Sequence, residues 1–442
     1  MSALALPISP TRGACPGLST PMPTGDGLLV RLLSTGTISL AAFGALCRAA
    51  RHHGNGIVEI TARGSIQVRG LTAASAPRFA NDVAALGIAT ADGVPVLTNA
   101  LAGLDAEEIL DANALAEDLR SMLSRTDLAA KLAPKVSVAI DGSGAVTLDD
   151  IAADVRLHAE MTQAGAMLRL GIGGDVASAI QFGVVAPARA VDAVVRLLEV
   201  VAAHGLSARA RAIVDAEGAK EFQLAIGGLL ISDGPRKGGD PQPDSRLRRN
   251  ERTMLSPVGL FLLRGGSYAS GVGLAFGHAD ASTLERLLEA AAKAGAHGVR
   301  AAVGRALIAL GLAHDSATGF AADAERLGFI VSADDPRRYV LACAGAPICA
   351  SAHIAARAMA PAIAEMVAPF IGGAVTIHVS GCAKGCAHGS PAALTIVGTP
   401  EGYALVTHGT ARDAPHSIVA EHELPGAIAR RESQLKHGVG YV

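Results

Sequence analysis

Four cysteines near the C-terminal end of the chain have the residue type and the spacing of a soft-metal site. Cys343 and Cys349 are separated by five residues, and Cys382 and Cys386 are separated by three. Two close pairs can converge on one metal centre, because each short loop directs two sulfur atoms inward. Structural zinc usually takes pairs about two to four residues apart, whereas a four-iron cluster accepts wider spacing. We therefore favour iron–sulfur binding over zinc and over thiols that are simply buried.

The segments around these cysteines predict one helix and one strand. Residues 350–369 have a helical pattern, which would place Cys349 at a helix N-terminus, where the helix dipole stabilises a thiolate. Residues 375–379 alternate as a strand, so His378 and Ser380 are expected on one face and the apolar residues on the other.

Length and composition set the broad class of protein. With 442 residues the chain is expected to contain two to three structural units, and 50% hydrophobic with 18% charged residues is typical of a packed globular protein. A formal net charge of -2 and the lack of Trp argue against nucleic acid as a partner. We see neither a signal peptide nor an uncharged apolar run of roughly 18 residues, so no membrane span is expected.

The cysteine count points to a reducing, cytoplasmic location. Six cysteines are too few for a disulfide scaffold in so long a chain, and four of them are clustered. Cys47 lies on the apolar face of a predicted helix and is expected in the core. Cys15 lies in a Pro/Gly-rich segment, and we assign it no role.

Several segments recur in the second half of the chain at nearly one offset. A strand at 27–32, a helix at 39–50 and a strand at 57–60 have counterparts that end in Leu310-Gly311-Leu312. Downstream, residues 134–142 align with 373–381. Several landmarks at one offset predict an internal duplication, in which only the second copy carries the four cysteines.

The duplication predicts six segments. These are an irregular segment (1–20), a ferredoxin-like half-domain (21–88), an α/β domain (89–235), a basic linker (236–256), a second half-domain (257–325) and a second α/β domain with the cysteines (326–442). Basic residues gather around the linker: Arg236, Lys237, Arg246, Arg248, Arg249 and Arg252. Two interpretations stay open for this segment, a solvated linker or a loop that folds onto an anionic ligand.

The chain resembles the sulfite and nitrite reductase hemoprotein superfamily. The cysteine spacing, the duplication, the segment Thr-Ala-Arg-Gly-Ser-Ile-Gln at 61–67 and the Asn-Ala-Leu-Ala-Gly segment that begins at Asn99 carry the resemblance. It implies an α+β fold, internally duplicated, with ferredoxin-like half-domains and two α/β reductase-like domains. It also implies that the four cysteines hold a [4Fe-4S] cluster, and that the last, Cys386, bridges to the iron of siroheme where siroheme is bound.

One departure from the superfamily bears on the substrate. Its reductases surround the reacting anion with two Arg and two Lys, which gather charge and protons for reduction. Arg63 and Lys135 match one residue of each kind, whereas Val94 and Ser137 stand in place of the other two. The loss of two positive charges argues against sulfite or nitrite as substrate.

Two segments resemble a particular branch of the superfamily, the precorrin-3B synthase family. They are residues 15–29 and Gly-Cys-Ala-Lys-Gly-Cys-Ala-His at 381–388. This resemblance implies an oxygen-dependent monooxygenase of aerobic cobalamin biosynthesis, which hydroxylates precorrin-3A at C20 and closes a γ-lactone. It implies a [4Fe-4S] cluster, a mononuclear non-haem iron, NADH as the ultimate electron source and an electron-donor protein.

A tetrapyrrole substrate calls for cations, because siroheme and precorrin-3A both carry many carboxylates. Arg63, Gln67, Arg69 and Lys135 are our candidates for substrate binding. Arg63 and Arg69 differ by an even number, so on a regular strand they would face the same side.

The mononuclear iron and the reaction type leave alternatives open. Non-haem iron that activates oxygen usually takes two His and one carboxylate. His52, His53, His378 and His388 are candidates, but the sequence identifies no carboxylate and no catalytic residue. The alternatives to the oxygenase are a siroheme-dependent sulfite or nitrite reductase and a non-catalytic tetrapyrrole-binding protein in which the cysteines hold zinc.

Overall fold

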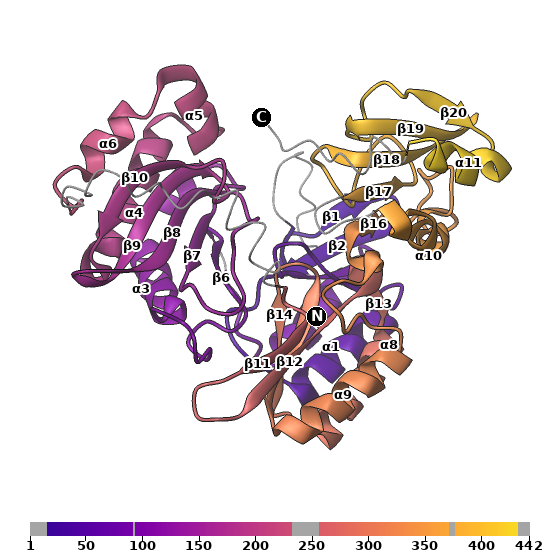
Figure 1. Cartoon of the computed structure of the whole chain (residues 1–442), viewed down its shortest axis with the longest axis horizontal. Coiled ribbons are helices and arrows are strands. Elements are labelled where there is room, and N and C mark those ends of the chain that lie inside the picture. Colours follow the sequence, from indigo (N-terminus) through magenta and orange to yellow (C-terminus); the bar gives the residue numbers. More distant parts are fainter. Residues whose placement is uncertain (1–15, 92, 232–255, 371–375, 432–442) are drawn as a thin grey trace.

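The computed structural model describes residues 16–91, 93–231, 256–370 and 376–431. In this part of the chain four five-stranded sheets carry the fold. Two sheets lie together with their helices at the centre of the molecule, and the other two form lobes on opposite sides of them (Figure 1). The basic residues at 236–252 and Cys15 lie outside the described residues.

The first central sheet has the strand order β1-β2-β5-β4-β13. Its elements are β1 (Met22–Thr24), β2 (Gly27–Leu32), β4 (Ile57–Ile60), β5 (Ile66–Leu71) and β13 (His278–Asp280), with helices α1 (Leu40–His53) and α2 (Ala76–Ala84). Helix α1 begins at Leu40 because the Ser39 side chain accepts a hydrogen bond from the Ala42 N–H, which caps the first turn. Its apolar face packs against the sheet and includes Cys47, which is buried in the core as predicted.

The second central sheet has the equivalent order β11-β12-β15-β14-β3. Its elements are β3 (Ile38–Ser39), β11 (Gly259–Leu262), β12 (Tyr268–Gly273), β14 (Gly298–Ala302) and β15 (Ala306–Leu312), with helices α8 (Ala281–Lys293) and α9 (His314–Arg326). Each copy gives one strand to the other: β13 pairs with β4, and β3 pairs with β14. One hydrophobic core therefore runs through both half-domains.

The two lobes repeat one topology, in which two parallel strand pairs are followed by two antiparallel pairs. The first contains β6 (Val96–Thr98), β7 (Val138–Asp141), β8 (Ala153–Thr162), β9 (Gly165–Gly174), β10 (Ile180–Val185), α3 (Ala112–Ser124), α4 (Pro187–Ala203), α5 (Ala210–Glu217) and α6 (Lys220–Ile226). The second contains β16 (Val340–Ala342), β17 (Ile377–Ser380), β18 (Ala392–Thr399), β19 (Gly402–Gly409), β20 (Ser417–Val419), α10 (Ala356–Val367) and α11 (Leu424–Ala429). Short 3-10 turns complete the chain: Leu128–Lys131, Ala275–Gly277, Pro336–Tyr339, Ala368–Phe370 and Glu421–Glu423. The predicted duplicated α+β fold is confirmed.

One predicted helix is wrong in its start. Helix α10 begins at Ala356, so Cys349 lies in a turn well before it and not at a helix N-terminus. The reason is that backbone N–H groups of the intervening residues bond outside a helical pattern: Ala350 donates to the Gly25 carbonyl at 3.0 Å, and His353 donates to the Gly381 carbonyl at 2.8 Å.

Among the described helices, none combines the length and the apolar character that a bilayer crossing requires.

Candidate active site

The two parallel strands β16 and β17 place the cysteine pairs at one edge of their sheet. Cys343 directly follows β16, and only Gly381 separates Cys382 from the end of β17. These strands are neighbours with Val340 opposite Ile377, so the loops at their carboxyl ends meet. The four predicted cysteines thus come together: charge on Cys343, Cys349 or Cys382 would raise the pKa of Cys386.

The spacing of the sulfur atoms helps to separate the two candidate metals. In a tetrahedral zinc site with Zn–S bonds of about 2.3 Å, the sulfur atoms would be about 3.8 Å apart. Among the described residues, no three cysteine sulfur atoms lie within 4.8 Å of one another. A wider spacing suits a cubane, whose ligands wrap a larger body. A spacing wider than a zinc ion needs is compatible with the predicted [4Fe-4S] cluster, and the identity of the metal centre stays a prediction.

The loops around the sulfur atoms are built to accept thiolates. The Gly381 N–H donates to Cys343 Sγ at 3.0 Å. Burial raises the pKa of the Cys343 thiol, and this N–H opposes that effect because it stabilises the charged form. Burial also raises the pKa of Cys386, and the Arg69 guanidinium acts in the opposite direction. As anions these thiols would repel one another, and a positively charged metal centre would offset that repulsion.

The first copy closes the site from the other side, through the turn between β1 and β2. A Cβ atom at Gly25 would lie 2.2 Å from Cys349 Sγ, so only glycine leaves room for this sulfur atom. The Gly25 carbonyl also accepts the Ala350 N–H at 3.0 Å. Residues from the two copies therefore share one site.

Next to Gly25, Arg69 forms a buried ion pair with Asp26. Its Nε and Nη2 atoms donate to the two carboxylate oxygens at 2.8 and 2.9 Å, and Nη1 lies 3.5 Å from Glu59. Burial acts to lower the pKa of Arg69, but the hydrogen bonds to Asp26 and the charges of Glu59 and Asp26 outweigh it and raise the pKa. Arg69 is thus a permanent cation beside Cys386. Substrate binding by Arg69 stays a prediction.

A polar row crosses the same face of the first central sheet, opposite the helices. Arg31, Gln67 and Glu59 lie side by side on β2, β5 and β4. With its amide oxygen toward Arg31, Gln67 accepts from Arg31 Nε at 2.9 Å and donates to Glu59 at 2.9 Å. Arg357 of α10 approaches Glu59 from the second lobe at 3.5 Å. Gln67, predicted from sequence to bind substrate, is therefore part of a charged network between the copies.

His378 is the most unusual polar side chain near the cysteines. It is fully buried, and neither ring nitrogen has a hydrogen-bond partner. Burial, assisted by the charges of His388 and Arg305, lowers its pKa to about 4, so the ring is neutral near pH 7. The ring centroids of His378 and His388 are 5.8 Å apart, and both side chains lie near Arg305 of the second half-domain. A buried ring with two free nitrogens suits a ligand that the chain itself does not supply.

Of the other two substrate candidates, Arg63 contacts the first lobe and Lys135 belongs to it. Arg63 lies in a turn before β5, not on a regular strand, so the expected common side with Arg69 does not apply. Arg63 donates to the Ser137 hydroxyl at 3.2 Å and to the Ala152 carbonyl at 2.7 Å. Lys135 is exposed just before β7.

The two replaced cations now have other environments. Val94 is buried in the core of the first lobe, where a guanidinium would lack partners. Ser137 is buried as well, accepts from Arg63, and donates its backbone N–H to Asp154 at 3.0 Å.

His52 and His53, two further metal candidates, lie at the end of α1. His53 Nε2 is 2.7 Å from Asp82, and the two histidine rings contact each other edge to face. In the described part of the chain, neither belongs to a group of three potential metal ligands.

Sequence reasoning missed Asp26, Arg31, Glu59, Arg305 and Arg357. A signal was present for two of them, because Arg31 and Glu59 interrupt otherwise apolar strands. Arg305 gave none: its positive φ of 65° and its approach to the histidines depend on the tertiary fold.

Comparisons with known proteins agree with the fold. Residues 20–86 match the family described as the nitrite/sulfite reductase ferredoxin-like half domain. The fold resembles the structure of the NirA protein of Mycobacterium tuberculosis with a TM-score of 0.71 and 19% identity, over 94% of this chain and 82% of that one.

A curated relative bears on the function. The chain is 37% identical over 447 residues to a protein named precorrin-3B synthase from Sinorhizobium sp., over 97% of this chain and 92% of the relative. A match of this extent covers both copies of the duplicated unit. The chain therefore belongs to the precorrin-3B synthase family.

Proposed function

We propose that the protein is an oxygen-dependent monooxygenase that converts precorrin-3A to precorrin-3B, with hydroxylation at C20 and closure of a γ-lactone. The proposal depends on the 37% identity to a relative of that name, which extends over 97% of this chain. The site supports it: the four cysteines lie near the polar row of Arg31, Gln67 and Glu59, which Arg357 approaches, and near His378, which is fully buried and neutral. We further propose a cytoplasmic location, because free thiols at this site need a reducing compartment.

We propose that Cys343, Cys349, Cys382 and Cys386 hold a [4Fe-4S] cluster. When bound, the cluster supplies single electrons, and a mononuclear iron supplies the activation of dioxygen. The chain contributes the setting: Arg69, paired with Asp26, places a fixed positive charge next to Cys386. The Gly381 N–H stabilises negative charge on the Cys343 sulfur atom. NADH as the ultimate electron source and an electron-donor protein complete the proposal.

We propose that the macrocycle lies between the polar row and the second lobe. Arg63, Gln67, Arg69 and Lys135 remain our substrate-binding candidates, and we add Arg305. Neutral His378 can donate one hydrogen bond and accept another, so it can bind a carboxylate or a ring N–H of the macrocycle without adding charge. Arg63 contacts the first lobe and Lys135 is an exposed residue of that lobe, so we propose that they contact the opposite end of the substrate.

The test is a single-turnover reaction with isotopically labelled dioxygen. Anaerobically purified protein is given precorrin-3A and reductant, labelled dioxygen is added, and the product is analysed by mass spectrometry. We expect one labelled oxygen atom in each product molecule. A product without label, or unchanged precorrin-3A from protein with an intact cluster, would refute the proposed reaction. Cys382→Ser serves as the matched inactive variant.

A further inference from the structure

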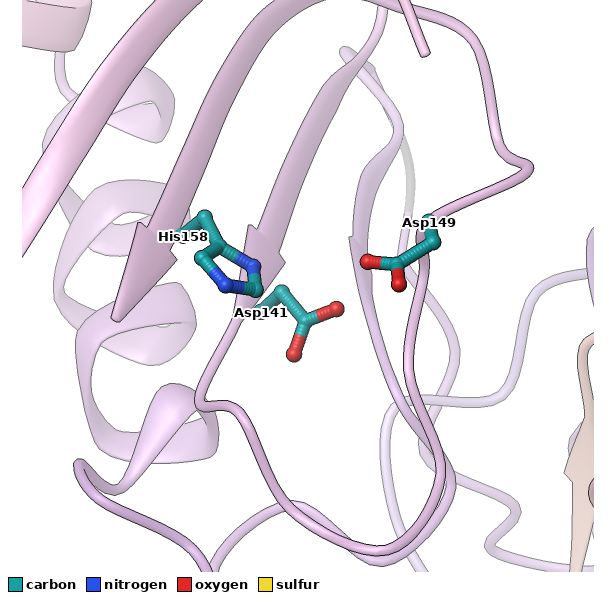
Figure 2. Close-up of side chains that lie close together, drawn as sticks. All are labelled: Asp141, Asp149 and His158. Atoms are coloured by element: carbon teal, nitrogen blue, oxygen red, sulfur yellow. The ribbon is translucent and has the colours of Figure 1, made fainter. Parts of the chain in front are cut away.

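Three potential metal ligands converge in the first lobe, away from the cysteines. One ligand atom each of Asp141, Asp149 and His158 lies within 4.8 Å of the others (Figure 2). Asp141 ends β7, His158 lies directly beside it on the parallel strand β8, and Asp149 comes from the loop that joins them. The strand pairing thus fixes two ligands, and the loop brings the third.

The carboxylate of Asp141 is held in place before any ion binds. Asp141 is fully buried, and its oxygens accept backbone hydrogen bonds from Ser143 at 2.8 Å and from Leu148 at 2.6 Å. A carboxylate oxygen has two lone pairs, so each oxygen that accepts one N–H retains a lone pair for a metal ion.

The tautomer of His158 is set by Ser143. The Ser143 hydroxyl donates its one hydrogen to the Ala159 carbonyl, so toward His158 Nε2, at 3.1 Å, it can only accept. Nε2 therefore carries the proton and Nδ1 has the free lone pair. Nδ1 is buried and has no hydrogen-bond partner. A ring held by one nitrogen while the other is open is the usual state of a metal-ligating histidine.

The internal duplication relates the loop of this site to the loop that carries two of the cysteines. The loop after β7 is the counterpart of the loop after β17, which carries Cys382 and Cys386. In the aligned segments Ser143 stands where the second copy has Cys382. The first copy thus has a loop at the position of the cysteine loop, with a hydroxyl where the second copy has the Cys382 thiol, and its three potential ligands lie beside that position.

We propose that Asp141, Asp149 and His158 bind one divalent transition-metal ion of the class of Fe²⁺, Mn²⁺ or Zn²⁺. Two carboxylates and one imidazole are ligands that these ions accept. The buried Arg156 guanidinium lies near both carboxylates and donates to the Leu148 carbonyl at 3.1 Å, so it offsets part of their charge.

A second group of three, His204, Glu217 and Glu221, lacks these features. Both ring nitrogens of His204 are already engaged, Nδ1 with the Val200 carbonyl at 2.9 Å and Nε2 with Glu217 at 3.4 Å. Both glutamates are exposed. This surface group serves as an internal comparison.

The test is a titration of the full-length, chelator-dialysed protein with Mn²⁺. Binding is measured as the loss of the electron paramagnetic resonance signal of free Mn²⁺. We expect one site in the wild type, weakened about tenfold or more in Asp149→Asn and in His158→Gln. Asp150→Asn, an adjacent change of the same charge, and Glu217→Gln in the surface group should bind as the wild type does. Equal cluster iron and equal circular dichroism in all variants show that the fold is intact.

Two results would overturn the proposal. One is a wild-type protein that does not bind Mn²⁺. The other is binding that survives in Asp149→Asn and His158→Gln or is lost in Glu217→Gln. None of these results depends on the monooxygenase activity, so the metal site and the proposed reaction can fail separately.

Discussion

The ion pair between Arg69 and Asp26 should stabilise the closed site, and Arg69→Met tests this. Methionine retains the apolar stem and removes the charge. The Asp26 side chain is 1% exposed and that of Arg69 is 12% exposed, so the variant leaves a carboxylate buried without its main cationic partner. Glu59 loses the same guanidinium but retains Arg357 at 3.5 Å.

The expected cost follows from this burial. Breaking a buried ion pair by removing one partner destabilises a protein by about 3–5 kcal/mol, because the remaining charge is uncompensated. Removing both charges, in Arg69→Met with Asp26→Asn, should recover more than half of that loss. The pH dependence has a defined sign. Burial would raise the pKa of Asp26, but Arg69 lowers it below its usual 3.8, so the stabilisation is complete above that value and is lost as the pH falls.

The assay is anaerobic urea unfolding followed both by cluster absorbance and by circular dichroism. We expect the first transition of Arg69→Met to move to lower urea and the double variant to lie between it and the wild type. Arg196→Met, which removes an exposed pair with Asp192, is the matched control and should leave the transition unchanged. A wild-type transition for Arg69→Met, or a double variant as unstable as the single one, would show that the buried pair is not the cause.

Three further predictions concern the same region. Gly25→Ala places a Cβ atom 2.2 Å from Cys349 Sγ and should lower the amount of cluster iron per chain. Gly36→Ala, whose Cβ atom would have no neighbour within 4 Å, is the control and should leave the iron content unchanged. Equal iron in both variants would contradict the contact between Gly25 and Cys349. Cys382→Ser should lose the brown absorbance, and an unchanged spectrum and iron content would remove Cys382 from the ligands. Burial lowers the pKa of His378 from 6.5 to about 4. As the pH falls, His378 is therefore protonated in the unfolded chain before it is protonated in the folded chain. The free energy of unfolding should fall by about 2 kcal/mol between pH 7 and pH 5. His378→Leu should lack this component in urea unfolding at the two pH values, and an equal pH dependence in both proteins would refute it.

Local patterns in the sequence predicted the elements that carry the site. Alternation predicted β2 and β4, and helical periodicity predicted α1. The cysteine spacing predicted a single centre, because neighbouring parallel strands bring their carboxyl ends to one edge. These features depend on residues close together in the chain.

Features that depend on distant residues were not predicted. The exchange of β3 and β13 between half-domains joins residues that are far apart in sequence. Residues 350–355 have helical propensity, yet contacts with Gly25 and Gly381 override it. The partners of Arg69 were hidden for the same reason, since Asp26 and Glu59 reach it across the sheet.

The most direct test of the central claim is acid–acetone extraction of the purified protein, with siroheme and iron counted per chain. The claim is that the four cysteines hold a cluster beside a site in which a tetrapyrrole is the substrate and not a resident cofactor. We predict iron and acid-labile sulfide in the amounts of a [4Fe-4S] cluster and no stoichiometric siroheme. One siroheme per chain would contradict the claim and identify the protein as a reductase, and zinc without iron would contradict the cluster itself.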